Sequence, residues 1–266
     1  MAYEQPSDLV SRAGRSLLNW LDSWRSVFRF AGVAIVEALT PSVYNSATRS
    51  VVFKQIYFTA WQILPRFSLF SALFSFVLIA IVVDTARSFG LAGYALEVTI
   101  RMLVLEMLPL MTALFVALRS GAATGTEVVL MHIHNEIRAM EEAGVDPLRF
   151  ELIPRVIGGT ISVLALTAVS SALALALAYL AMYGFHLWGL DEFTRVMANI
   201  FDPVSIIVLW AKILAFGLAV TVIPITEALA APQKLFFAPI AVLRGMVRLF
   251  FVLMLIEVLS LALKYI

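Results

Sequence analysis

Three ionisable side chains interrupt long apolar stretches of this chain: Glu106, Lys212 and Glu257. A charged group inside hydrocarbon is costly, so such residues are candidates for a functional site. Each lies about six to eight residues inside its apolar run, counted from the end that we assign to the outer side, or roughly 9 to 12 Å at about 1.5 Å of rise per residue. We therefore expect the three side chains to meet at one level of the membrane.

These side chains supply two carboxylates and one ammonium group, which can neutralise one another and hold a polar or charged group of a substrate. The alternative is a structural ion pair beside a protonated acid. Pro109, one turn after Glu106, has no backbone N–H and so frees polar backbone groups nearby. The sequence thus predicts a substrate pathway in the outer half of the membrane that includes Glu106, Pro109, Lys212 and Glu257.

The composition places the chain in a membrane. Hydrophobic residues make up 62% of the 266 residues and charged residues 14%, with a mean hydropathy of +0.95, so a soluble fold would lack the polar surface that it needs. There is no cysteine, which excludes a disulfide framework and a thiolate metal site. His132 and His134 are two residues apart and point to different faces of a helix, which favours a solvated pair over a pair of metal ligands.

Several function classes lack the residues that they require. No G-x-x-x-x-G-K-[ST] loop, Ser/His/Asp set or H-E-x-x-H motif is present, so we expect neither ATP binding by that route nor catalysis by this chain alone. Basic residues follow the membrane flanks instead of alternating with exposed aromatic residues, which gives no support to nucleic acid binding. We expect no metal, no bound cofactor and no cleaved signal peptide.

The apolar runs predict an all-α integral membrane protein with a single domain over residues 1–266. Five runs approach the roughly 20 residues needed to cross hydrocarbon, at 67–83, 100–118, 156–183, 204–225 and 241–263. Before them, a mixed segment at 51–64, closed by Pro65, predicts a short helix that enters the membrane at a bend.

The first 45 residues predict an amphipathic helix that lies in the membrane interface and is ended by Thr40, Pro41 and Ser42. Its tryptophans, Trp20 and Trp24, and its arginines are residue types that anchor to lipid headgroups. The apolar stripe of this helix consists of Leu17, Leu21, Trp24, Phe28, Ala31 and Ile35.

The distribution of Lys and Arg predicts the orientation. They gather before the first span, in the connection after the second and around the connection before the last, whereas the other side has only Arg87, Arg101, Arg195 and Lys264. By the positive-inside rule, the N-terminus and the connection after the second span are cytoplasmic. Five crossings then place the C-terminus on the periplasmic side, where Asp191, Glu192 and Asp202 face outward.

The connection at 119–155 predicts a rigid cytoplasmic elbow. Its apolar residues recur at helical spacing, at Leu130, Ile133, Ile137 and Met140. Charged residues occupy the other faces, at Glu136, Arg138, Glu141 and Glu142. Gly144 is expected to end this helix, and Asp146 and Pro147 to begin the next. A helix held between two spans is suited to receive a mechanical push from a soluble partner; the alternative is an amphipathic loop that lies on lipid.

A patch of small residues precedes the elbow. Gly121 and Gly125, with two alanines between them, allow another backbone to approach closely, and Arg119 stands just before them. Without the lysine of a phosphate-binding loop, these glycines favour helix packing.

The stretch 106–155 resembles the MlaE/YrbE permease family, the membrane subunits of ABC transporters that work with MCE proteins on lipids. Weaker similarity in the order and length of the elements extends over most of the chain. The matching residues are Glu106, Leu108, Pro109, Ala117, Arg119, Ser120, Gly121, Ala122, Glu127, Met140, Glu141, Val145, Asp146, Pro147, Leu148, Arg149, Pro154 and Arg155.

The resemblance implies that the elbow is a coupling helix that docks into a separate cytoplasmic ABC ATPase subunit, which uses the ATP. It also implies that two permease chains, identical or different, enclose a lipid pocket open to the outer leaflet. In the family a glutamate, a lysine and an acid border that pocket, and Glu106, Lys212 and Glu257 occupy the matching places. The coupling residues expected on this basis are Glu127, Ile133, Ile137, Arg138, Met140, Glu141, Glu142, Asp146 and Pro147.

The resulting hypothesis is a permease subunit of an ABC-type transporter in the inner membrane. It would move phospholipid or a related lipid between that membrane and a periplasmic MCE protein. One alternative is a secondary transporter that binds a coupling proton or ion at the intramembrane carboxylates, although inverted repeats are not visible. Another, a membrane-embedded lipid-modifying enzyme, needs a nucleophile or metal set that the sequence does not show.

Overall fold

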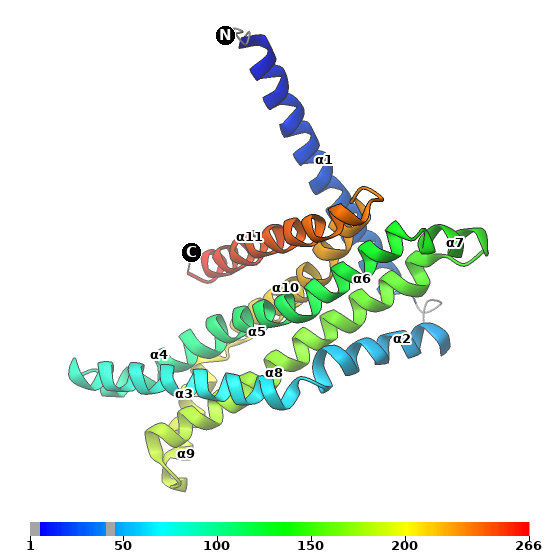
Figure 1. Ribbon diagram of the computed structural model, residues 1–266. Coiled ribbons are helices and arrows are strands. Elements are labelled where there is room, and N and C mark those ends of the chain that lie inside the picture. Colours follow the sequence, from blue (N-terminus) through cyan, green and yellow to red (C-terminus); the bar gives the residue numbers. More distant parts are fainter. Residues whose placement is uncertain (1–5, 41–45, 266) are drawn as a thin grey trace.

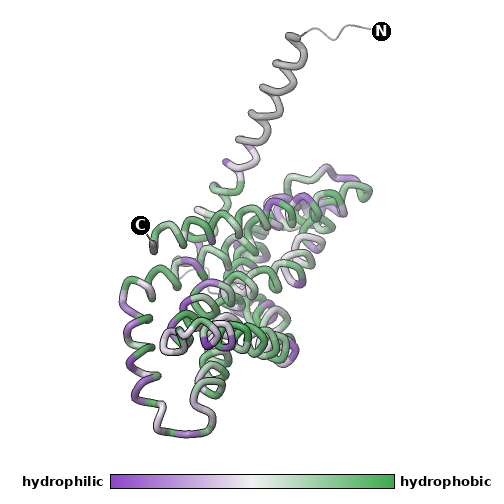
Figure 2. Tube along the Cα trace, turned by 90° about the vertical axis from the view of Figure 1, so that its left-hand side faces the viewer, coloured by the Kyte–Doolittle hydropathy of each residue, from purple (hydrophilic) through white to green (hydrophobic). Residues whose placement is uncertain are grey.

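The computed structural model describes residues 6–40 and 46–265, and within these ranges the chain forms helices and no strand (Figure 1). Five helical stretches are long and apolar enough to cross a membrane: Thr48–Ser88, Ala95–Ile133, Leu148–Tyr183, Pro203–Leu229 and Leu235–Lys264. Apolar residues follow these stretches through the bundle in Figure 2. The predicted all-α membrane fold with five spans is confirmed.

The first stretch joins two predicted elements. It runs through α2 (Ser46–Ile56), a π-helix η2 (Tyr57–Trp61) and α3 (Leu64–Ser88). The helix predicted at 51–64 is thus continuous with the first span, and its irregular part lies before Pro65. Pro65 is in the first turn of α3, where its missing N–H costs no hydrogen bond.

The second stretch also extends beyond its predicted apolar run. After a 3₁₀ turn, η3 (Ala92–Tyr94), it consists of α4 (Ala95–Thr99), η4 (Ile100–Met107), α5 (Leu108–Val116), η5 (Ala117–Gly121) and α6 (Ala122–Ile133). Both η4 and η5 are π-helices. The prediction of one elbow helix through residues 130–140 is wrong, because Asn135 has a left-handed backbone with φ of 60° and separates α6 from α7 (Glu136–Glu142).

The chain turns back sharply after α7. Gly144 has φ of +75°, a conformation that suits glycine after a helix end. Asp146 Oδ1 then accepts a hydrogen bond from the Leu148 amide at 2.9 Å, as an N-cap does. The π-helix η6 (Leu148–Leu152) and α8 (Ile153–Tyr183) follow without a break.

The connection between α8 and the fourth span contains a helix that the apolar runs do not predict. After η7 (Leu187–Gly189), α9 (Leu190–Ile200) packs its last residue, Ile200, into the bundle. Asp202 caps α10 (Pro203–Leu229) by accepting a hydrogen bond from the Val204 amide at 3.2 Å. A hydrogen bond from Ser205 lowers the pKa of Asp202, which keeps the cap ionised. The chain ends with η8 (Leu235–Phe237) and α11 (Ala238–Tyr265).

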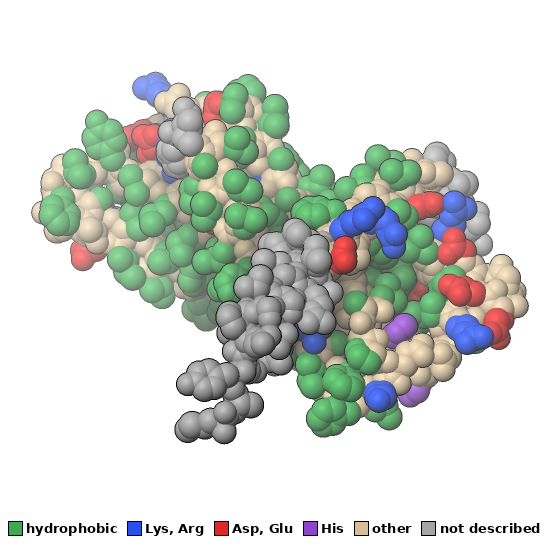
Figure 3. Space-filling model, turned by 90° about the horizontal axis from the view of Figure 1, so that it is seen from above, with side chains coloured by type: hydrophobic (Ala, Val, Ile, Leu, Met, Phe, Trp, Pro, Cys, Tyr) green, Lys and Arg blue, Asp and Glu red, His purple; other side chains and the backbone are tan. Residues whose placement is uncertain are grey.

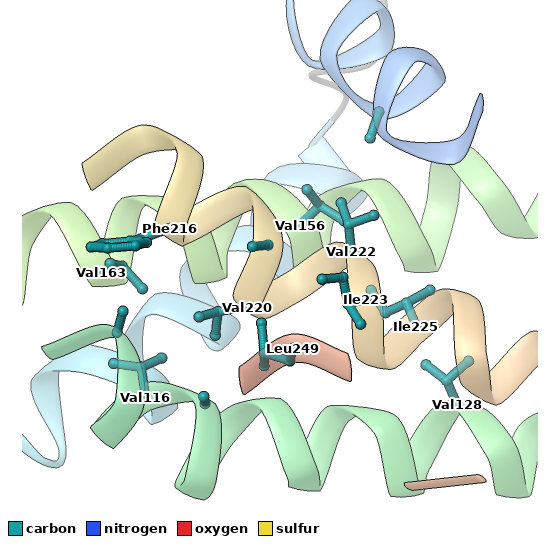
Figure 4. Packing of buried hydrophobic residues seen from close by; sticks show 14 of the residues in the cluster. Val116, Val128, Val156, Val163, Phe216, Val220, Val222, Ile223, Ile225 and Leu249 are labelled. Atoms are coloured by element: carbon teal, nitrogen blue, oxygen red, sulfur yellow. The ribbon is translucent and has the colours of Figure 1, made fainter. Parts of the chain in front are cut away.

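Helix α10 lies in the middle of the bundle, packed against α6, α8 and α11. Figure 4 shows its side chains Phe216, Val220 and Ile223 among valines of α5, α6 and α8 and Leu249 of α11. Small residues bring the backbones together, since a Cβ on Gly217 would lie 2.9 Å from Thr160 Cγ2 and 3.0 Å from Thr160 Cα. Close van der Waals packing of this kind stabilises helix pairs in lipid.

The N-terminal helix α1 (Pro6–Ala38) leaves the bundle near the ends of α10 and α6 (Figure 1). Its side chains are described from Asp22 onward, and there Val27 and Ala34 are buried. Of the predicted stripe, Phe28 and Ile35 are 69% and 42% exposed and so do not pack on the bundle. The side chains of Leu17, Trp20 and Leu21, and Pro41 and Ser42 altogether, lie outside the described residues. A position in the interface plane remains a prediction.

The two ends of the bundle differ in charge. Helix α7 lies at one end, and α4, α9 and the C-terminus lie at the other (Figure 1). In Figure 3, charged side chains of both signs gather at the α7 end, while the surface toward the other end is mainly hydrophobic.

Candidate functional site

The three intramembrane charges meet, as their depths predict. Lys212 on α10 donates a hydrogen bond to Glu106 on η4, and its Nζ lies 3.4 Å from Glu257 on α11. The Lys212 side chain is 2% exposed, and the two carboxylates are 13% and 12% exposed. One lysine therefore joins η4, α10 and α11.

A fourth charged residue completes this cluster. Lys264, near the end of α11, donates from Nζ to Glu106 Oε1 at 2.9 Å. The sequence analysis places Lys264 on the outer flank and does not assign it to the site. With Lys264 included, the cluster has two cationic and two anionic groups, so its formal charge is zero. A neutral set is far less costly to keep in a membrane than the surplus carboxylate of the predicted trio.

The backbone around Glu106 explains how this carboxylate reaches the cluster. Glu106 is in the π-helix η4, and π segments inside α-helices occur frequently at functional sites. Pro109 is buried at the start of α5, one turn later, where it cannot donate a backbone hydrogen bond. The position of Pro109 thus agrees with its predicted effect on the helix at Glu106.

The cluster borders a narrow crevice of about 10 Å³. Two hydroxyl residues, Ser205 and Ser260, line the crevice beside Glu106, Lys212 and Lys264. Glu257 Oε2 is buried and accepts no hydrogen bond from the described residues, although Lys212 Nζ is 3.4 Å away. Ammonium groups at this site can bind an anionic group, and the carboxylates can bind a cationic or hydroxyl group.

The predicted coupling residues gather at the other end of the bundle. No described residue of α7 is buried, and Arg138 and Glu142 form an exposed ion pair at 3.0 Å. The predicted residues that α7 carries are Ile137, Arg138, Met140, Glu141 and Glu142. Ile133 ends α6, while Asp146 and the buried Pro147 lie in the turn that leads to η6.

Glu127 lies behind this surface. Arg155 on α8 donates to Glu127 on α6 at 2.8 Å and also to Glu151 on η6. Arg149 on η6 reaches across to Glu37 on α1 at 2.8 Å. The two arms that carry α7 are thus fastened to each other and to α1.

The small-residue patch faces α10. A Cβ on Gly121 would lie 3.2 Å from the Val220 carbonyl, and one on Gly125 would lie 3.3 Å from Pro224 Cβ. Arg119 donates to the Phe58 carbonyl at 3.0 Å and so joins η5 to η2. This arginine borders a polar groove of about 580 Å³ that Lys54, Glu127 and Arg155 also line.

A second buried ion pair, which is not part of the predicted site, joins α10 and α11 nearer to the end of the bundle that carries α7. Arg248 on α11 donates to Glu227 on α10, which is 6% exposed. The fourth predicted span ends at residue 225, so Glu227 falls just outside it. An acid just inside a helix end, opposite an arginine on the next antiparallel helix, is the signal that could have identified this pair.

Histidine and carboxylate residues do not gather into a metal site in the described part of the chain, where no group of three potential ligands is found. His132 is in the last turn of α6 and His134 lies in the turn before α7, so the two do not share a helix face.

The model of the family described as Permease MlaE matches residues 52–263, most of the chain. The chain belongs to the MlaE permease family. A probable ABC transporter permease protein of Rickettsia felis is 23% identical over 221 residues, which cover 81% of this chain and 82% of the relative. One of Rickettsia prowazekii is 25% identical over 199 residues, 73% of each chain.

Family membership and the five spans make this chain a multi-pass membrane permease of an ABC transporter. ABC permeases form the transmembrane pathway, are not themselves enzymes and work with an ATPase subunit. The predicted class, transporter subunit, is therefore confirmed.

Proposed function

We propose that this MlaE-family permease moves phospholipid or a related lipid between the inner membrane and a periplasmic MCE protein, driven by a separate ATPase. The observation that carries the proposal is the cluster of Glu106, Lys212, Glu257 and Lys264. Its lysines attract a headgroup phosphate and its carboxylates tune the charge, while the apolar walls beside it accept acyl chains.

The orientation in the proposal follows from the charged end of the bundle. The α7 end is cytoplasmic, because Lys and Arg favour that side, and the C-terminal part of α1 contacts the bundle there. The C-terminus, α9 and the four-residue cluster then lie toward the periplasm. This arrangement supports docking of the ATPase on α7 and delivery of lipid to, or from, an MCE protein at the opposite end.

A second permease chain completes the proposed pathway. In the most apolar window of the last span, only 22% of the residues are buried. The exposed side chains Phe251, Leu255 and Val258 form a continuous apolar face on α11, next to Glu257. A second permease chain, identical or homologous, that covers this face would enclose the lipid beside the cluster.

Two measurements test the proposal. Lys212→Ala should reduce lipid transfer in proteoliposomes at least about tenfold, because the anionic headgroup loses its buried cation, while the ATPase still binds. Reversal of Glu141 and Glu142 to lysine should abolish co-purification of the ATPase, whereas the same reversal of Asp191 and Glu192 at the other end should not. Unchanged transfer by Lys212→Ala would contradict the lipid pathway.

One observation favours the alternative of an ion- or proton-coupled secondary transporter. Glu257 Oε2 is buried without a hydrogen-bond donor among the described residues, which suits a carboxylate that takes up a proton or cation. This alternative requires transport by the chain without any ATPase. Lipid-independent proton uptake by the purified chain in vesicles, abolished by Glu257→Gln, would favour it over the lipid permease.

A further inference from the structure

Helices α10 and α11 carry a second polar cluster, built around Glu227 and Arg248. Arg248 is 11% exposed, donates to Glu227 and to Ser23 Oγ of α1, and its guanidinium lies 3.9 Å from the ring centroid of Trp24. Glu227 is 15 positions after Lys212 on the same helix. At about 1.5 Å per residue this is roughly 22 Å, so the two clusters lie toward opposite faces of a core about 30 Å thick.

Two nitrogens of the Arg248 guanidinium donate no hydrogen bond to the described residues. Its Nε and one terminal nitrogen, Nη2, are buried and find no acceptor among the described residues. Each of these two nitrogens has lost water without gaining a hydrogen bond, which is costly even though the guanidinium pairs with Glu227 and lies over the ring of Trp24. An acceptor oxygen from a molecule outside the chain would remove this cost.

A groove of about 590 Å³ adjoins these donors, a volume typical of small-molecule sites. It is bounded by α1, α10 and α11, which meet at this end of the bundle in Figure 1. Leu243 and Val247 form its apolar wall, while Arg244 is exposed at its edge. Two arginines and one glutamate leave the lining with a net positive charge.

We propose that this groove binds the phosphate of an anionic phospholipid from the leaflet on the α7 side. Arg244 and Arg248 supply donors to the phosphate oxygens, and the apolar wall accepts the first part of an acyl chain. Basic pockets between membrane helices bind anionic headgroups in this way. The site is separate from the cluster at Lys212 and does not depend on the direction or substrate of transport.

The net positive charge of the groove and its apolar wall together favour an anionic lipid over other ligands. A soluble phosphate would match the arginines but leave Leu243 and Val247 uncovered. A second protein chain could cover the wall but would have to bring an anion to Arg248. A lipid with an anionic headgroup satisfies both requirements.

The test is a titration of the full-length, delipidated chain in detergent with phosphatidylglycerol, with bound lipid counted by native mass spectrometry. Arg244→Gln should weaken binding of the tightest lipid about tenfold, because one charge-assisted contact is lost. The paired variant Glu227→Gln with Arg248→Gln removes both charges without leaving one buried alone, and should weaken binding as much or more. Arg49→Gln, an exposed arginine of α2 at the same end, is the matched control and should have no effect.

Three results would overturn the lipid proposal. Equal affinity of the Arg244→Gln chain and the unchanged chain would overturn the proposal. Displacement of the lipid by millimolar inorganic phosphate would assign the groove to a soluble anion, and loss of a dimer in these variants without loss of lipid would assign it to a second chain. Lys212→Ala should keep this lipid, so failure of the transport proposal and failure of this one can be told apart.

Discussion

At the scale of single residues, Lys212 is a buried cation that pairs with two carboxylates on different elements, and Lys264 also pairs with one of these, Glu106. Among the described residues, Lys212 is the cation that pairs with Glu257, so loss of its ammonium leaves that carboxylate without this partner. Removing one member of a buried ion pair is far more costly than replacing the whole pair by neutral groups.

This asymmetry predicts the behaviour of two variants. Lys212→Met should lower the free energy of unfolding by about 3 kcal/mol, because Glu257 is left buried and uncompensated. Lys212→Met combined with Glu257→Gln should recover most of that loss. Reversible unfolding in mild detergent measures both, with Lys54→Met, an exposed lysine, as control. Equal losses in the single and the double variant would show that Lys212 and Glu257 do not interact.

The sequence predicts the meeting of Glu106, Lys212 and Glu257 because their depths follow from helical rise alone. It does not predict Lys264, whose long side chain returns from the end of α11 into the membrane. The pairing of Arg248 with Glu227 is also missed. That contact depends on how far α10 continues beyond its apolar run and on the relative rotation of two antiparallel helices, neither of which a hydropathy pattern contains.

At the scale of elements, close packing of α8 on α10 depends on two glycines with different neighbours. A Cβ on Gly159 would overlap only the side chain of Thr221, whereas one on Gly217 would meet both the side chain and the Cα of Thr160. A side-chain obstacle can be removed by a second substitution. A backbone obstacle can be relieved only by moving the helix.

Gly159→Ala should therefore lower the free energy of unfolding by about 1 to 3 kcal/mol, the usual cost of overpacking, and should cost little when Thr221→Ala is already present. Gly217→Ala should cost a similar amount, but Thr160→Ala should not rescue it. Double-mutant cycles on thermal unfolding measure both couplings. Rescue in the second cycle would mean that α8 and α10 are not held at this separation.

The spacing of apolar residues does not predict where the helices of the elbow begin and end. Apolar residues continue at helical spacing from Leu130 to Met140, yet the helix breaks between them. The break depends on Asn135, which tolerates the left-handed conformation better than most residues and whose Oδ1 accepts a hydrogen bond from Gln233 at 3.3 Å. The partner is almost a hundred positions away, so only the folded chain brings it into view.

At the scale of the whole molecule, one span, Leu148–Tyr183, separates α7 from α9, so these two helices lie on opposite sides of the membrane. The chain contains no cysteine, so a single introduced thiol reports its own side. In sealed vesicles with the periplasmic face outward, Glu192→Cys should react fully with a membrane-impermeant maleimide and Glu142→Cys should not react until the vesicles are opened. Both residues are exposed, so a difference in labelling reflects sidedness. Labelling of both thiols in sealed vesicles would refute a crossing of the membrane by Leu148–Tyr183.

The π-helices change the direction in which the side chains of a span point. A π turn contains more residues than an α turn, so side chains after it are rotated relative to the pattern before it. The segments η4 and η5 lie on either side of α5, so one long span contains three stretches whose lipid-facing stripes are out of phase. A helical wheel drawn over all of Ala95–Ile133 would therefore show apolar residues on every side and no distinct stripe. The gap that aligns this chain with a relative lacking a π turn belongs inside the membrane, at η4 or η5, and not in a loop.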